Sequence, residues 1–257
     1  MKQVRFIPIE NCGLQVREPQ EGQTESRTIE GTPIVFGQRS VNLTPWSDIR
    51  EVYEVLEPGC ISQELINRSD VILNLNHSSM VPDVLGRCRN GKGTLSLELR
   101  EKNIGCRCDL PRTNNANDAL ELMKRGDITG MSFAFMADEE DTENGVSYER
   151  TAEQSADGKE VWLRHVKRIT GLYDVSIVTH PAYEQTSVAT REQGDEMMKH
   201  IDMQAGESEE QRQQRETSDA DAKAEEERRL EEAAQRAHEM RLLRLRSQRR
   251  HIAEREF

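Results

Sequence analysis

Residues 126–136 read GDITGMSFAFM, and they carry the clearest indication of the fold. The run after Gly130 is apolar except at Ser132, which is typical of a buried β-strand that follows a tight turn. A second apolar run, LYDVSIVT at residues 172–179, contains one carboxylate, Asp174. Two buried strands, each with an isolated polar side chain, predict a β-rich domain in which those side chains have hydrogen-bonding partners.

Shorter apolar runs on either side extend the β pattern. Further strands are predicted at residues 29–36, 71–75, 94–99, 104–110 and 162–169, with the third and fourth as an antiparallel pair. Residues 48–56 suit either a helix or a strand, and the polar residues 138–159 are predicted to form an exposed excursion. A helix is expected between Asn114 or Asn115, either of which can cap it, and Gly126, which ends it. The pattern predicts a mixed β and α fold, either a small barrel or a folded sheet, decorated by helices.

Composition divides the chain. Hydrophobic residues make up 35% and charged residues 32% of 257 residues, which is too polar for one core along the whole length. We expect an N-terminal extension at residues 1–26, a folded domain at residues 27–192 and a charged helical tail at residues 193–257. In the tail, helix-forming residues carry a narrow apolar stripe with a three- or four-residue spacing, so the helix needs a partner or another copy of itself to be stable. The alternative is a frayed, solvated helix.

Charge and hydropathy exclude several protein classes. A net charge of −12 argues against a nucleic-acid-binding protein, because phosphate contacts need clustered lysine and arginine. No run approaches the roughly 18 apolar residues of a membrane span, and the N-terminal residues do not resemble a secretory signal. The five cysteines, an odd and scattered set, indicate reduced structural thiols. We therefore expect neither a metal nor a cofactor.

One histidine is placed as a general base would be. His77 directly follows an apolar strand and precedes Ser78 and Ser79, so it is expected at a strand end beside a loop. A general base must be shielded enough to be oriented and open enough to meet its substrate. The alternative is an ordinary surface or turn histidine. His165 is a poorer candidate, because it lies in a cationic run.

The two isolated polar residues have more than one possible role. A buried hydroxyl such as that of Ser132 costs about 1–3 kcal/mol without a hydrogen bond, and either a catalytic imidazole or a backbone carbonyl could supply it. Asp174 could orient the imidazole of a catalytic triad, or it could pair with an arginine such as Arg87. Strand alternation places His180 on the same face as Asp174, so His180 is a second candidate for the third position.

Several short motifs follow one another over about residues 27–190. They are Ile29-Glu30-Gly31, Val35-Phe36, Pro58-Gly59, Asn76-His77, Leu85-Gly86-Arg87, and residues 126–135 and 172–182. In this order they resemble the motifs of the prohead proteases of tailed bacteriophages. The resemblance implies a fold similar to herpesvirus assemblin, which is a small closed β-barrel surrounded by helices.

The resemblance also implies a set of site residues. The histidine of the family's Asn-His motif corresponds to His77, and the serine of its Gly-Met-Ser-Phe motif corresponds to Ser132. The acidic third member corresponds to Asp174, where the family commonly has glutamate. The herpesvirus relatives use a second histidine instead, which keeps His180 as an alternative.

The implied function is that of a serine endopeptidase of capsid maturation. Its substrates would be the scaffolding segment of the major capsid protein precursor and the protease itself, and it would act as an oligomer inside the procapsid, in the cytoplasm of the bacterial host. One alternative is a catalytically silent assembly factor with the same fold. Another is a protease fused to its own scaffold, whose tail is the main structural product. In the capsid-maturation protease, the tail at residues 193–257 is expected to dock on the scaffold or to be self-cleaved.

Overall fold

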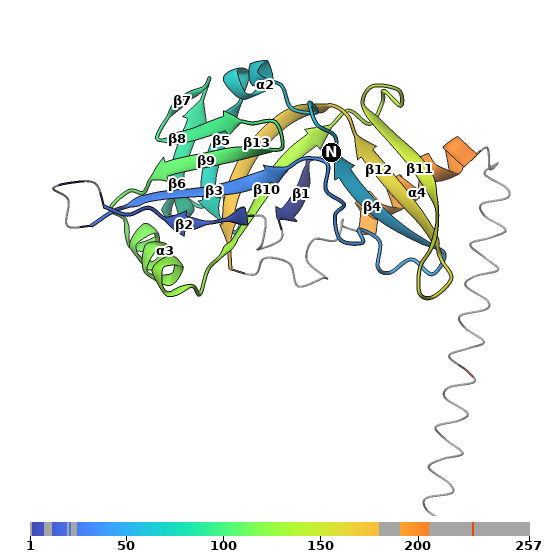
Figure 1. Ribbon diagram of the computed structural model, residues 1–257, viewed down its shortest axis with the longest axis horizontal. Coiled ribbons are helices and arrows are strands. Elements are labelled where there is room, and N and C mark those ends of the chain that lie inside the picture. Colours follow the sequence, from blue (N-terminus) through green and yellow to red (C-terminus); the bar gives the residue numbers. More distant parts are fainter. Residues whose placement is uncertain are drawn as a thin grey trace, which may run out of the picture. The chain divides into compact units, whose positions relative to one another are not determined.

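The computed structural model describes residues 2–7, 12–19, 21, 25–179, 191–205 and 228, and these form three β-sheets with few helices (Figure 1). The strands are β1 (Gln3–Ile7), β2 (Gln15–Val16), β3 (Thr28–Val35), β4 (Arg50–Leu56), β5 (Asp70–Leu75), β6 (Val84–Arg89), β7 (Lys92–Gly93), β8 (Leu95–Leu99), β9 (Asn103–Asp109), β10 (Gly130–Ala137), β11 (Val146–Gln154), β12 (Glu160–Val166) and β13 (Ile169–Val178). The helices are α2 (Gln63–Arg68), α3 (Asn114–Arg125), α4 (Arg191–Ala205) and the 3₁₀ helix η1 (Val81–Asp83).

The largest sheet has the strand order β1-β10-β13-β5-β6-β7. The other two sheets have the orders β2-β3-β9-β8 and β11-β12-β4. Strand β5 runs parallel to β13, so the carboxyl ends of these two strands lie at the same edge of the sheet. The antiparallel pairing predicted for residues 94–99 and 104–110 is confirmed as β8 with β9.

The core lies between the six-stranded and the four-stranded sheets. Met131, Phe133 and Phe135 alternate along β10 and are fully buried, and the two phenylalanine rings stack with centroids 5.0 Å apart. The Sδ atom of Met131 lies 3.8 Å from the Sγ atom of Cys106 on β9, which joins the two layers. Because alternate residues of a strand point to opposite faces, Ser132 lies on the other face of β10.

The prediction of a closed β-barrel surrounded by helices was wrong. Among the described residues, β1 and β7 form the two ends of an open sheet, the other strands form separate sheets, and helices are few. Sequence alternation reports which side chains of a strand are buried, and stacked sheets bury them as well as a barrel does. Most of the predicted helical tail, residues 206–227 and 229–257, lies outside the described residues, and the predicted domain limits stay a prediction.

Two local predictions also need correction. Residues 138–159 contain strand β11, which pairs antiparallel with β12, so this segment is more than an exposed excursion. Helix α3 has Thr113 as its N-cap rather than Asn114 or Asn115, and the side chain of Asn115 instead donates to Asp83. Its predicted end is confirmed, because Gly126 adopts the left-handed conformation at φ 81°.

A buried network of charges connects β1 to the sheet that contains β4 and β12. The guanidinium of Arg5 donates to both oxygens of Glu54, at 2.7 and 2.8 Å. Arg164 on β12 also pairs with Glu54, and with Glu139 at the end of β10. Burial raises the pKa of Glu54, but the two arginines outweigh it and hold that pKa below its ordinary value. The network therefore contributes stability at neutral pH that is lost as the pH falls through this lowered pKa.

We predict that Glu54→Gln destabilises the fold strongly. The change leaves two buried guanidinium groups without their shared carboxylate, and breaking a buried ion pair in this way costs about 3–5 kcal/mol. The measurement is the free energy of unfolding from urea denaturation. The control is Glu98→Gln, because Glu98 pairs with Arg100 where both side chains are exposed, at 66% and 52%. Equal unfolding midpoints for the two variants would contradict the prediction.

Candidate active site

Three side chains from different parts of the chain form one hydrogen-bonded row. The Nε2 atom of His77 lies 2.6 Å from the Oγ atom of Ser132. The Nδ1 atom of the same ring lies 2.5 Å from Oδ1 of Asp174. Ser132 is on β10 and Asp174 on the adjacent β13, while His77 follows the end of β5. Sheet pairing thus brings together residues that lie 55 and 97 positions apart in the sequence.

The turn that carries His77 has a strained backbone. Asn76 and His77 both have positive φ angles, 49° and 56°, which non-glycine residues rarely adopt. The N–H of Asn76 donates to the carbonyl of Ile177 at 3.0 Å, and the N–H of Ser78 donates to Leu75 at 2.9 Å. Such strain of about 1–3 kcal/mol persists only where surrounding contacts determine the conformation.

Two further hydrogen bonds stabilise the turn at Asn76 and His77. The backbone N–H of His77 donates to Oγ of Ser176 at 2.7 Å. The hydroxyl of Ser176 in turn donates to the side-chain oxygen of Asn74, the neighbouring residue on β5. Ser176 and Asn74 are both buried, and their hydrogen bonds fix the backbone from which the His77 ring projects.

The environment of Ser132 gives its hydroxyl two acceptors. Its Oγ atom lies 2.8 Å from the backbone carbonyl of Arg5 on β1, as well as beside His77. Ser132 itself is fully buried, whereas the His77 side chain keeps 15% of its surface exposed. A hydroxyl has one proton, so the proton lies either toward the Arg5 carbonyl or toward the imidazole. Only the second arrangement prepares Oγ for attack.

Each oxygen of Asp174 has its own cationic or N–H partner. Oδ1 faces His77, and Oδ2 accepts from Nζ of Lys2 at 2.8 Å. Burial of Asp174 raises its pKa, but the hydrogen bonds and charges of His77 and Lys2 outweigh burial and bring the pKa below the ordinary aspartate value. The carboxylate is therefore ionised at neutral pH, where it can only accept hydrogen bonds.

That ionisation fixes the tautomer of the imidazole. Because Asp174 accepts, the ring proton belongs on Nδ1, and Nε2 presents its lone pair to Ser132. A row of carboxylate, neutral imidazole and hydroxyl in this order can remove the hydroxyl proton and stabilise the imidazolium that results. The arrangement is therefore chemically competent for acyl transfer through a serine nucleophile.

The structure decides between some of the alternatives left by the sequence. Arg87 pairs with Asp70 and not with Asp174. His180 lies outside the described residues. No sequence pattern marks the Arg5 carbonyl, since any residue type has the same backbone acceptor. Lys2 was also missed, because a lysine near the start of a chain has no pattern that links it to a distant aspartate.

The cysteines do not compete for the role of nucleophile. All five are free and buried. Burial raises the pKa of the Cys12 thiol to about 11 and that of Cys60, Cys106 and Cys108 to about 12, so little reactive thiolate forms at neutral pH.

We predict that none of the five thiols reacts quickly with Ellman's reagent in the native protein at pH 8, and that all five react after denaturation in guanidinium chloride. The measurement is the absorbance of released thionitrobenzoate with time. Stoichiometric labelling of a native cysteine within seconds would contradict the burial of the thiols.

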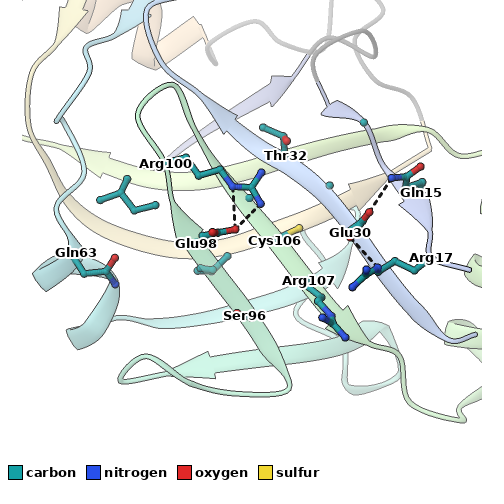
Figure 2. A pocket seen from close by; sticks show the side chains of 15 residues that line it. Gln15, Arg17, Glu30, Thr32, Gln63, Ser96, Glu98, Arg100, Cys106 and Arg107 are labelled. Atoms are coloured by element: carbon teal, nitrogen blue, oxygen red, sulfur yellow. Dashed lines mark hydrogen bonds and ion pairs between the residues drawn. The ribbon is translucent and has the colours of Figure 1, made fainter. Parts of the chain in front are cut away.

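A groove of the described residues lies elsewhere, on the four-stranded sheet (Figure 2). It encloses about 700 Å³, and none of Ser132, His77 and Asp174 lines it. Two pairs of its charged side chains form ion pairs, Arg100 with Glu98 and Arg17 with Glu30, and Arg107 also lines it (Figure 2).

The described residues contain neither a metal-binding cluster nor a membrane-spanning helix. Nowhere in these ranges do three or more histidine, cysteine, aspartate or glutamate side chains gather in a way that could bind a metal ion. No helix in the described part of the chain combines the length and apolarity needed to cross a membrane.

Comparison with known proteins assigns the family. The chain matches the family model described as caudovirus prohead serine protease over residues 13–201. No curated protein matches the chain. Among solved structures, the capsid assembly protease of bacteriophage T4 matches with 11% identity and a TM-score of 0.35, over 67% of this chain and 97% of that chain. The resemblance found in the sequence motifs is confirmed by the family match, and this chain belongs to the caudovirus prohead serine proteases.

Proposed function

We propose that the chain is a serine endopeptidase that uses Ser132 as nucleophile, His77 as general base and Asp174 as the third member of a triad. The observation that carries this proposal is the continuous row of contacts Ser132–His77–Asp174, at 2.6 and 2.5 Å. Membership of a serine protease family supports the same chemistry. The contact of Oδ1 of Asp174 with Nδ1 of His77 supports the assignment of Asp174 as the third member.

The proposed reaction follows from the positions of the protons. Oγ of Ser132 attacks the carbonyl carbon of a peptide bond while its proton passes to Nε2 of His77. The imidazolium, stabilised by Asp174, then protonates the departing amine as the C–N bond breaks. Water next attacks the acyl-enzyme, with His77 again accepting a proton, and releases the second product. Backbone N–H donors must stabilise the oxyanion in both halves of the reaction.

We propose as substrates the scaffolding segment of the capsid protein precursor and the protease itself, during procapsid assembly in the bacterial host. This follows from the family, whose description is that of a prohead protease. The fully buried Ser132 suits an enzyme that is dormant until assembly, because a peptide bond reaches Oγ only after a neighbouring segment moves.

The same burial is the one observation that favours a second candidate, a catalytically silent assembly factor with this fold. The two candidates are separated by co-expression of the chain with its capsid precursor, followed by mass spectrometry of the protein termini. The protease produces new termini in the precursor and in its own chain, and Ser132→Ala produces none. Intact precursor with the wild-type chain, in particles that assemble normally, would support the silent factor.

A further inference from the structure

Strand β1 and Lys2, directly before it, together contact every member of the Ser132–His77–Asp174 row. Lys2, directly before the strand, donates to Asp174. The Arg5 carbonyl accepts from Ser132. The ring of Phe6 meets the His77 ring edge-on, with centroids 6.1 Å apart and an interplanar angle of 88°. These contacts come from residues 2–7, which precede the matched family region at residues 13–201.

The strand is fixed in register, so these contacts are not those of a loose terminus. Strand β1 pairs antiparallel with β10, and Phe6 lies directly opposite Ser132. Gln3, Arg5 and Ile7 are buried on the other face of the strand, and Arg5 is held by the buried carboxylate of Glu54. Lys2 is one residue from this anchored strand, and its backbone carbonyl accepts from the side chain of Gln193 on α4 at 3.0 Å.

Asp174 needs a second partner to keep its orientation. A carboxylate held through one oxygen can rotate about its Cβ–Cγ bond, and rotation would lengthen the contact with Nδ1 of His77. Lys2 occupies the second oxygen at 2.8 Å, so both oxygens are held at once. The Asp174 side chain is only 6% exposed, whereas that of Lys2 is 50% exposed. The lysine therefore supplies charge to a shielded carboxylate while its own desolvation stays small.

We propose that Lys2 is a positioning residue of the active site, which holds Asp174 ionised and oriented toward His77, and that β1 delivers it there. This inference rests on the proposed triad. The proposal gives residues 2–7, which lie outside the matched family region, a role in catalysis. Among the described residues, the titratable groups that face Asp174 are the imidazole of His77, after β5, and the ammonium group of Lys2, before β1.

The first test measures Asp174 directly and does not require activity. Full-length Ser132→Ala protein, with any purification tag placed after Phe257, is labelled with ¹³Cγ-aspartate, and the Asp174 signal is assigned from Asp174→Asn. Replacing Lys2 by methionine is expected to raise the pKa of Asp174 toward its ordinary value, and Lys2→Arg is expected to restore the low value. An Asp174 titration that is the same with lysine and methionine at position 2 would overturn the inference.

The second test is kinetic. With the catalytic serine intact, Lys2→Met is expected to lower kcat roughly 5- to 10-fold with little change in KM, as for loss of one partly screened charge-assisted hydrogen bond. Lys2→Arg should recover most of kcat. The control is Lys124→Met, which removes a lysine of similar exposure paired with Glu25 on the surface. A rise in KM with unchanged kcat, or equal losses in Lys2→Met and Lys124→Met, would contradict a positioning role.

The two tests separate this inference from the proposed function. If the wild-type chain cleaves nothing, the proposed protease fails, whereas the titration of Asp174 still decides whether Lys2 controls it. If the chain is active and the titration of Asp174 does not change on replacement of Lys2, the proposed protease function is supported and the proposed role of Lys2 is refuted.

Discussion

Ser132→Ala is expected to abolish trimming of the capsid precursor, with a loss in kcat of at least ~10⁴-fold. Alanine leaves no nucleophile for His77 to activate, and the neighbouring hydroxyl of Ser176 already donates to Asn74. The measurement is the rate at which new termini appear in co-expressed precursor. The free energy of unfolding should fall by only about 1 kcal/mol, since one hydrogen bond to the Arg5 carbonyl is lost.

The matched control is Ser96→Ala, which removes an exposed hydroxyl on β8. It should trim the precursor at the wild-type rate. Wild-type trimming by Ser132→Ala would show that another group is the nucleophile, and equal losses in both variants would show that the assay reports folding or assembly.

Asp174→Asn is expected to reduce kcat by about 10⁴-fold while the fold is retained. An amide is neutral and can donate as well as accept, so it neither fixes the Nδ1–H tautomer of His77 nor stabilises the imidazolium. The measurement is again the rate of precursor trimming, at pH 7–8. Asp174→Glu should keep far more activity than Asp174→Asn, because it restores the charge.

His180→Ala provides the comparison for the third position. If Asp174 has the role proposed here, the His180 variant should keep activity within a few-fold of wild type. Near-wild-type activity of Asp174→Asn together with an inactive His180→Ala would transfer the role to His180.

The pKa of Asp174 also predicts how stability changes with pH. Its pKa in the folded protein is below the ordinary value, in spite of burial, because His77 and Lys2 stabilise the ionised form. The carboxylate therefore contributes stability that is present above its unfolded pKa and is lost as the pH falls through the folded pKa. Asp174→Asn should show a smaller loss of stability on acidification than the wild-type chain.

The candidate site residues on the strands could be predicted because they are polar residues within apolar runs. Ser132 and Asp174 interrupt apolar strands, and a polar group in such a position needs a partner. His77 follows a strand that ends at the same sheet edge as the strand of Asp174. The strands themselves were predictable for the same reason, because their buried faces alternate with period two.

Strand β1 escaped prediction because it inverts the usual pattern. Its buried positions include Gln3 and Arg5, while Val4 and Phe6 are only partly buried. Polar side chains are buried there because Glu54 supplies a countercharge, 49 positions away in the sequence. A local pattern cannot reveal a partner at that distance. The closed barrel was implied by the family resemblance, and strand alternation could not correct it, since alternation says nothing about which strand pairs with which.

The most direct measurement of the central claim is the site at which a fluorophosphonate probe reacts. The probe forms a bond only with a serine whose proton is removed by a neighbouring base. In procapsids assembled by co-expression, peptide mapping by mass spectrometry should locate a single adduct in this chain at Ser132, and His77→Ala should remove it. An adduct at another serine, or equal labelling of Ser132 with and without His77, would contradict the proposed catalytic row.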